Sequence, residues 1–439
     1  MRLWIVLSLL LLTGCQHYQA QPLGKAPVYA DLVVPAASIR GVALPPHSIA
    51  IGTPLSLTDL ELLAVSHNPQ LRLLRAHAGV QEAQWVDAGL LPDPVLSGSR
   101  DHPYSGPDQL NAWSSNLSMD LGAILQRAHK RRAAMALNQQ IHLDLLWQEW
   151  LVVAQVRSLA YRIQGDHDRM KLLQQRLALL KPLADQLNTA LQQGNIDKTV
   201  QQPAQLTVED IQQQLHDLTL NQLQDNQALQ ALLDLPPQLS VSLSHLPAIT
   251  DINIPTRLDL QHRPDMLALQ AGYASADEHF RLAILGQFPD INLGINNASD
   301  TTGTHTVGLS FQLPLPVFNG NRGQIAIAHA TRDSLQQEYQ QRLTQAQREV
   351  DNLRSRVTLL HTQINRVQHD LEIEMQGQTL WAHALASHQI DLMTYTMLMN
   401  TCLQKRMDLQ QAQQSLDEQQ LALMSLLGIV PSWEYSPHA

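Results

Sequence analysis

The feature that most limits the fold of this chain is the absence of proline between Pro316 and Pro431. Within this stretch, the run from Asn321 to Ser387 carries apolar residues at spacings of three and four. They are Leu343, Ala346, Val350, Leu353, Val357, Leu360, Ile364, Val367 and Leu371. This heptad pattern predicts a helix that packs against another helix by knobs into holes. At about 1.5 Å per residue the helix would be roughly 100 Å long, which is more than a compact globular domain accommodates.

The chain also contains four pairs of similar segments in the same order, offset by 194 to 197 residues. The pairs are HNPQLRLLRA with HRPDMLALQA, LLPDPVLSG with QFPDINLGI, GNID with HQID, and ALLDLPP with SLLGIVP. Self-similarity at a nearly fixed spacing indicates a tandem duplication. We therefore expect a first repeat at 56–235, a linker at 236–255, a second repeat at 256–430 and a C-terminal tail at 431–439.

Each repeat has the same predicted order: a short helix, two strands, a very long helix, a sharp turn and a return helix. The short helices are expected at about 56–88 and 256–285, and the strands at about 93–100, 111–119, 289–297 and 305–313. The long helix of the first repeat, at about 121–193, is less regular, and Pro182 is expected to kink it.

The strands alternate in polarity, most clearly at 306–313, where Val307, Leu309 and Phe311 alternate with glycine and polar residues. Each strand has the length of a tilted strand that crosses a bilayer, and apolar-out, polar-in alternation is typical of outer-membrane barrels. A soluble hairpin with one buried face is the alternative. Four strands cannot close a barrel, and an open edge cannot lie in lipid, so several chains would have to share one barrel.

The N-terminus indicates secretion. Arg2 precedes an apolar run from Leu3 to Leu12, which predicts a signal peptide over 1–14. The following Leu-Thr-Gly-Cys resembles the lipobox of bacterial lipoproteins, which implies that Cys15 carries lipid and that 15–55 is a lipid-anchored extension. In such lipoproteins Gln16, rather than Asp, favours passage to the outer membrane. An ordinary signal peptide with an unrelated cysteine is the alternative.

Composition excludes several other classes of protein. The net charge of -10 argues against a nucleic-acid partner. If Cys15 is lipidated, Cys402 has no disulfide partner. The 19 histidines are scattered without metal-ligand spacing, and no phosphate loop or nucleophile motif is present. We therefore expect no metal, no cofactor and no enzymatic activity.

Over about 50–430 the repeated plan resembles the outer membrane factor family, the TolC-like efflux channels, with NPQL and RPD opening the two copies. The resemblance implies a mainly α fold with a small membrane β part. Three chains would share a twelve-stranded barrel, and long antiparallel helical hairpins would form a periplasmic tunnel. It implies a passive exit channel in the outer membrane of a Gram-negative bacterium. Its partners would be outer-membrane lipid, a periplasmic adaptor (membrane fusion protein) and an inner-membrane RND-type transporter.

In that family the sharp turns lie at the periplasmic tips and contact the adaptor. The resemblance implies contact residues Gly194, Asn195, Ile196 and Asp197 in the first repeat, and His388, Gln389, Ile390 and Asp391 in the second. The two aspartates are expected to cap the return helices with their side-chain oxygens. Thr394 stands where the family often has an acidic aperture residue, so it is the aperture candidate and no acidic ring is expected there.

The passage LPLPVFNGNRGQIAIA at 313–328 resembles the strand-to-helix passage of the heavy-metal branch, which is CzcC- and CusC-like. Pro314 and Pro316 would end the strand because they lack an N–H. Gly320 and Gly323 are expected to permit the tight turn into the long helix. The passage favours heavy-metal cations as cargo. Multidrug efflux and type I secretion stay open, and a lipid-anchored periplasmic adaptor without a pore is a further alternative.

Overall fold

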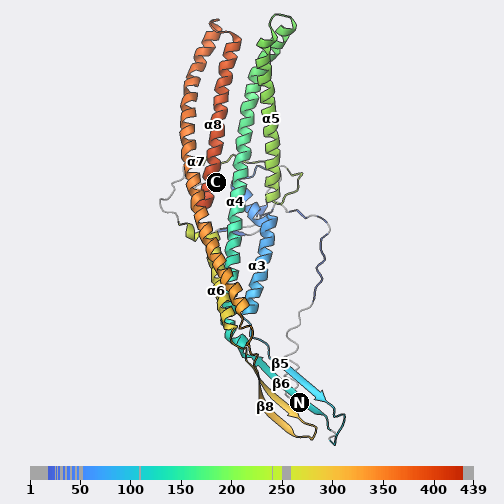
Figure 1. Cartoon of the computed structure of the whole chain (residues 1–439). Helices are drawn as coiled ribbons and strands as arrows, with labels where there is room; N and C mark the ends of the chain where they lie inside the picture. The colour runs from blue at the N-terminus through green and yellow to red at the C-terminus, as the bar shows by residue number, and fades with distance from the viewer. Residues whose placement is uncertain are drawn as a thin grey trace.

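The computed structural model describes residues 53–107, 110–239, 241–249 and 259–428, together with 18–24, 26, 28–29 and four short strands between Val33 and Ser48. The molecule is elongated, with a small sheet at one end and two helical hairpins reaching toward the other (Figure 1). The predicted signal peptide, Cys15 and the tail at 431–439 lie outside the described residues. The short strands form two antiparallel pairs: β1 (Val33–Val34) with β4 (His47–Ser48), and β2 (Ala37–Ile39) with β3 (Val42–Leu44).

The two repeats contain the same series of elements. The first consists of α2 (Leu57–His67), α3 (Pro69–Ala88), β5 (Val95–Asp101), β6 (Ala112–Asp120), α4 (Leu121–Gln192) and α5 (Lys198–Leu232). The second consists of η1 (Leu260–His262), α6 (Pro264–Leu285), β7 (Asn292–Ser299), β8 (His305–Gln312), α7 (Arg322–Ala386) and α8 (Leu392–Leu427). The mainly helical fold with four strands that the sequence predicts is confirmed.

The prediction of a single helix at 56–88 is wrong in one respect, because the helix is interrupted at Asn68. A residue before proline is pushed out of the helical region, and Asn68 has φ -50 and ψ 124. Its side-chain oxygen accepts hydrogen bonds from the backbone N–H groups of Gln70 and Leu71. These bonds cap the start of α3, so that a new helix begins where α2 ends. By contrast, α4 runs as one helix through Pro182 for 72 residues, or roughly 110 Å. Among the described residues, no helix combines the length and apolarity needed to cross a membrane.

The order of the strands determines the order of the helices. The sheet is antiparallel in the order β5-β6-β7-β8, and α3, α4, α6 and α7 continue from these strands in the same order. Farther from the sheet, α5 packs on α4, α4 packs on α8, and α8 packs on α7. The helices therefore form a layer whose lateral edges are α7 on one side, and α3 followed by α5 on the other.

Apolar seams hold the layer together. Five of the predicted heptad residues of α7 are buried, which confirms that seam: Ala346, Val350, Ile364, Val367 and Leu371. Midway along the molecule, a larger core gathers fully buried leucines of α2 and α5 around Val156 of α4, together with residues of the inter-repeat segment 239–249. Each fully buried leucine contributes about 1.5–3 kcal/mol relative to an exposed one.

Buried charges lie where α4, α5 and α8 meet. Arg162 donates two hydrogen bonds of 2.6 Å to the carboxylate of Asp225. Asp166 is buried beside them and accepts a hydrogen bond from Gln414 at 3.2 Å. Burial raises the pKa of Asp166, and it raises the pKa of Asp417 to about 6, with a smaller contribution from the charge of Glu418. Asp417 is thus a carboxyl group that the folded chain holds more easily in its neutral form.

The wild-type protein is expected to lose stability as the pH rises from about 4 to about 6, and we predict that Asp417→Asn removes this loss. The folded-state pKa lies above the ordinary 3.8, so the folded chain binds more protons than the unfolded chain in this window. Wild-type stability therefore falls as pH rises through it. Thermal unfolding should give the variant a higher midpoint than wild type at pH 7 and a similar one at pH 4. Asp185→Asn, an exposed carboxylate of α4, is the control. The prediction would be contradicted if the unfolding midpoint of the Asp417 variant depended on pH in the same way as that of the wild type.

Candidate functional site: the sheet, its junctions and the tips

One face of the four-stranded sheet is apolar and exposed. The register places Leu96, Leu117, Ile295 and Leu309 side by side in one row across all four strands. Met119, Leu293 and Phe311 form the next row toward the helices. Leu309 is 89% exposed and Phe311 is 78% exposed. An ordered apolar surface that none of the described residues covers indicates an apolar partner or medium.

The opposite face is polar and carries little charge. Its central row is Ser97, Asn116, Asn296 and Gly308, and the neighbouring rows add mainly serine and threonine. Ser310 donates a 2.9 Å hydrogen bond to Asn116 across the intervening strand. This is possible because Gly294 lies between them, and a Cβ there would come within 2.6 Å of the Asn116 oxygen. On this face the side chains of the central strands β6 and β7 are half-buried, whereas those of the edge strands β5 and β8 are mostly exposed.

The junction after β8 differs in one residue from the sequence expectation. The ladder ends at Gln312, before Pro314 and Pro316. Two residues adopt left-handed conformations, Gly320 at φ +52 and Asn321 at φ +54. Gly323, expected to permit the turn, lies instead inside the first turn of α7 and has no positive φ. Asn321 takes that role, because asparagine tolerates the left-handed region better than most residues.

In each repeat, a side chain near the start of the long helix binds a carbonyl oxygen near the end of the preceding short helix. Asn321 donates a 2.7 Å hydrogen bond to the carbonyl oxygen of Ala283, near the end of α6. In the first repeat, Arg127 donates a 2.7 Å hydrogen bond to the carbonyl oxygen of Gly89, at the end of α3. The two residues do not occupy equivalent positions, because Asn321 is the N-cap of α7 whereas Arg127 is the seventh residue of α4. Arg127 and Asn321 were not among the predicted site residues.

The β6–α4 junction depends on close packing at Gly122. Asp120 ends β6 and caps α4, accepting the Ala123 N–H at 3.1 Å. Asp290 lies so close to Gly122 that a Cβ there would come within 2.2 Å of its carboxylate. Asp290 also accepts a 3.0 Å hydrogen bond from Gln126. The end of α6 is thereby held against the start of α4.

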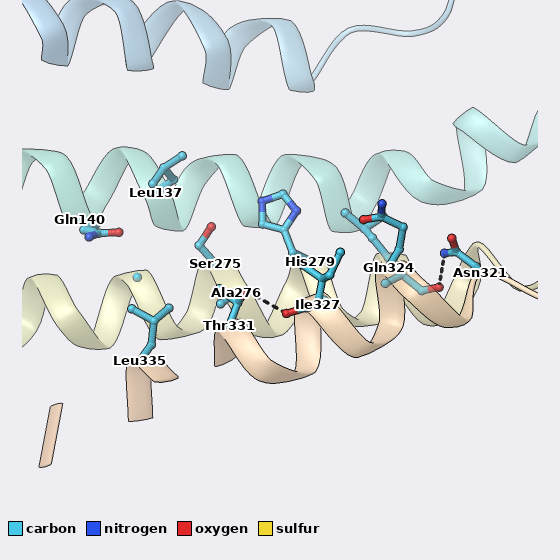
Figure 2. Close-up of a pocket in the computed structure, with 14 residues that line it drawn as sticks. Leu137, Gln140, Ser275, Ala276, His279, Asn321, Gln324, Ile327, Thr331 and Leu335 are labelled. Carbon is cyan, nitrogen blue, oxygen red and sulfur yellow. Dashed lines mark hydrogen bonds between the residues drawn. The ribbon is translucent and has the colours of Figure 1, made fainter. Parts of the chain in front are cut away.

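A cavity of about 580 Å³ lies beside the junction, between α4, α6 and α7. Figure 2 shows His279 of α6 between α4 and the start of α7, with Gln140 and Gln324 on either side. The remaining lining is mostly aliphatic, and Ser275 is already bound to the carbonyl oxygen of Ala133. The lining has no carboxylate and no cysteine, so the cavity offers no evident nucleophile or acid–base pair.

The two tip turns have the same backbone and different residues. Gly194 has φ +73, and Asn195 N–H bonds to Ala190 O at 2.9 Å. His388 has φ +57, and Gln389 N–H bonds to Ala384 O at 2.8 Å. Both are helix C-caps of the Schellman type, which normally uses glycine at the left-handed position. A histidine therefore occupies a position where its side chain is unfavourable.

The predicted caps of the return helices differ from each other. Asp391 accepts the Thr394 N–H at 2.7 Å, and hydrogen bonds from Thr394 hold the pKa of this exposed carboxylate below its ordinary value. Asp197 occupies the same N-cap position but makes no side-chain hydrogen bond, so the expectation that it caps α5 is wrong. The other tip residues Ile196 and Ile390 are partly buried, and Thr394 is exposed on the first turn of α8.

Within the described part of the chain, no three His, Cys, Asp or Glu side chains are grouped so that they could hold a metal ion. Cys402 is buried on α8, and Gln378 of α7 donates to its sulfur at 2.9 Å. The long helices thus carry structural side chains, and the chemically distinctive surfaces are the sheet and the tips.

Residues 257–429, nearly the whole second repeat, match the family model of the outer membrane efflux proteins. The chain is 24% identical over 254 residues to the Toxin and drug export protein A of Aggregatibacter actinomycetemcomitans, covering 54% of this chain and 55% of that protein. The chain spans about half the length of the curated relatives it matches.

Solved structures resemble nearly the full length of the fold. The outer-membrane channel OprN aligns with a TM-score of 0.72 at 18% identity, over 86% of this chain and 91% of OprN. The channel CusC aligns with a TM-score of 0.70 at 18% identity, over 92% of this chain and 100% of CusC. At this identity the likeness establishes the fold, including the first repeat, which the family model does not reach.

We predict that His388→Gly stabilises the protein and that Gly194→Ala destabilises it, each by about 1 kcal/mol, because only glycine lacks the steric cost of a left-handed residue. The two substitutions are made at equivalent positions of the two tips, so each serves as the control for the other. Chemical denaturation should shift the midpoints in opposite directions. A lower midpoint for the His388 variant would mean that the imidazole makes stabilising contacts in the assembled protein.

Proposed function

We propose that this protein is the outer-membrane exit channel of a tripartite efflux system, and that it conducts its cargo passively from the periplasm to the exterior. The observation that carries the proposal is the four-stranded sheet with an exposed apolar face, a polar face and two edges that no other described strand pairs with. The match of 257–429 to outer membrane efflux proteins and the fold shared with OprN and CusC support it. No enzymatic activity is proposed, because the channel needs none.

The unpaired edges argue for an oligomer. Backbone N–H and C=O groups along the outer edges of β5 and β8 would be unsatisfied in lipid, at several kcal/mol each. Joining β8 of one copy to β5 of the next satisfies them. The family resemblance makes the number three, with twelve strands in one barrel. The apolar face would then contact lipid and the polar face would line the lumen.

The lateral edges of the helical layer support the same assembly. On α7, Leu359, Ile373 and Leu380 are exposed at heptad-related spacing, away from the seam with α8. On the opposite edge, α3 exposes Leu73 and Val80, seven residues apart, and α5 exposes Leu206, Leu220 and Leu223. In the proposed trimer, α7 of one copy packs against α3 and α5 of the next and closes the tunnel.

We predict that neighbouring residues of β8 respond in opposite ways to a positive charge. Leu309→Arg places the charge on the lipid face, where it costs about 2–4 kcal/mol near the bilayer centre. It should reduce the amount of trimer in the membrane. Gly308→Arg places the charge in the lumen, where an added Cβ meets nothing within 4 Å. It should assemble normally and lower cation conductance, measured as single-channel current in a planar bilayer.

The two β8 variants also separate the channel from a pore-free adaptor or scaffold lipoprotein. A wild-type protein that gives no current, and two arginine variants that are equally tolerated, would contradict the channel. Current with normal assembly of the Leu309 variant would reverse the proposed faces of the sheet.

We further propose that the tips bind a periplasmic adaptor joined to an inner-membrane RND-type transporter, and that Asp197 and Asp391 face the adaptor. Asp197 makes no side-chain cap bond, so its carboxylate is available to a partner. Thr394 stands at the aperture. The protein is proposed to be anchored through lipid on Cys15 and to extend from the outer membrane into the periplasm.

For the cargo we propose heavy-metal cations, on the resemblance of 313–328 to the heavy-metal branch. The relative named for toxin and drug export favours a second candidate, drug efflux or type I secretion. A lumen-facing sheet of mainly uncharged residues fits either cargo, because selection would occur in the transporter.

One complementation experiment tests cargo and tips together. A strain without the gene should become sensitive to copper, zinc, cobalt or cadmium and not to drugs or detergents, and the wild-type gene should restore growth. The Asp197→Ala/Asp391→Ala double variant should reach the membrane as trimer and fail to restore growth, since it would not retain the adaptor. His369→Ala, at an exposed position of α7 away from the tips, is the control.

Sensitivity to drugs alone would assign the drug-efflux alternative. Full complementation by the double variant, with the adaptor still co-purifying, would remove the two aspartates from the adaptor contact. Those two results are independent, because cargo is read from the deletion strain and tip function from the variant.

A further inference from the structure

The last row of the apolar face, at the end of the sheet far from the helices, differs in chemistry from the apolar rows nearer the helices. It consists of Arg100 on β5, Trp113 on β6, Ser299 on β7 and His305 on β8, directly paired across the four strands. The row of Gly98, Ser115, Asn297 and Val307 lies between it and those apolar rows. The rings of Trp113 and His305 approach to 6.3 Å between centroids, although β7 lies between their strands. Ser299, which is 7% exposed, is small enough to lie beneath them.

Arg100 is the single formally charged residue on this face of the four strands, all of whose residues the structure describes. It is exposed, and no ion pair joins it to a carboxylate in the described part of the chain. Asp101, the next residue, points to the opposite face, since successive strand residues alternate. The guanidinium therefore lies one row beyond the apolar rows, and no counter-ion for it lies within the described residues.

A tryptophan beside an arginine at the end of an apolar band is the pattern of a membrane–water interface. Tryptophan is enriched at the level of lipid headgroups, and arginine keeps its charged group in the polar layer while its stem lies along apolar surface. The guanidinium also matches phosphate geometry with two parallel N–H donors. His305 adds a ring N–H within the same row.

We propose that Arg100, Trp113 and His305 form a binding site for the phosphate of an anionic lipid headgroup in the outer leaflet. Arg100 pairs with the phosphate, His305 donates a hydrogen bond, and Trp113 lies against the glycerol or sugar part of the lipid. The site rests on the proposed function, which places this end of the sheet at the outer surface. In the closed barrel, His305 and Arg100 are the residues of this row at the two edges that copies join, so the row would continue around the barrel.

The partner is inferred to be a lipid phosphate because the three side chains share their face with the apolar row of Leu117 and Leu309. One row separates them, and in that row Val307 adds a further exposed apolar side chain. A soluble anion gains nothing from that neighbouring surface. A lipid gains from both contacts, since its chains cover the apolar rows while its phosphate meets Arg100. Inorganic phosphate is the alternative source of the same chemistry, and the test separates the two.

The experiment uses full-length channel in nanodiscs of phosphatidylcholine containing a minor fraction of phosphatidic acid. Native mass spectrometry counts phosphatidic acid retained per channel at increasing lipid fraction. Arg100→Gln should weaken the apparent affinity about fivefold per removed charge, the size expected for one cation near an anionic surface. Arg100→Gln/His305→Gln should weaken it further. Arg131→Gln, which removes an exposed charge from α4, should leave it unchanged.

Inorganic phosphate at high concentration should not displace the lipid, and displacement would overturn the assignment to a lipid. Equal retention by wild type and the Arg100 variant, or an equal loss in the Arg131 variant, would overturn the site itself. Each of these results would leave the proposed channel function intact if the protein still conducts current. Failure of wild type to enter nanodiscs and to conduct would remove both the proposed function and the lipid site.

Discussion

The hydrogen-bonded order of four short strands governs the arrangement of the helical layer. Because α3, α4, α6 and α7 continue from β5, β6, β7 and β8, the ladder register decides which helices become neighbours. The connections at the junctions then preserve that order. Asp120 caps α4 directly at the end of β6, and Asn321 fastens the start of α7 to the end of α6. Without this transfer from sheet to helix, heptad seams alone would permit several helix registers.

Periodicity in the sequence was sufficient to predict the elements. The three-and-four spacing around Val350 and Ile364 located the buried seam of α7, and the alternation around Leu309 located β8 within a residue. Both signals are local and repeated many times, so single exceptions do not obscure them. The break at Asn68 was the exception, since helical periodicity continues across it while Pro69 removes one backbone donor.

The contacts of the junctions and tips could not be predicted in the same way. That Asn321 rather than Gly323 takes the left-handed conformation depends on a carbonyl group 38 residues earlier in the chain. Asp197 and Asp391 have equivalent sequence positions, yet only Asp391 turns its oxygen toward the helix. Such differences depend on which side-chain rotamer is adopted, at a free-energy difference of about 1 kcal/mol, and the sequence pattern does not encode it. The two tips have the same backbone but different side chains, as Gly194 and His388 illustrate.

The unbroken course of α4 also has a mechanical consequence. The helix extends from the end of β6 to the first tip without a loop that could absorb bending. A rigid tilt of α4 about the packed contact between Gly122 and Asp290 would carry the first tip with it. Over roughly 110 Å, a tilt of about 5° would displace the tip by about 10 Å. A small change of angle beside the sheet would thus become a large displacement at the opposite end of the molecule.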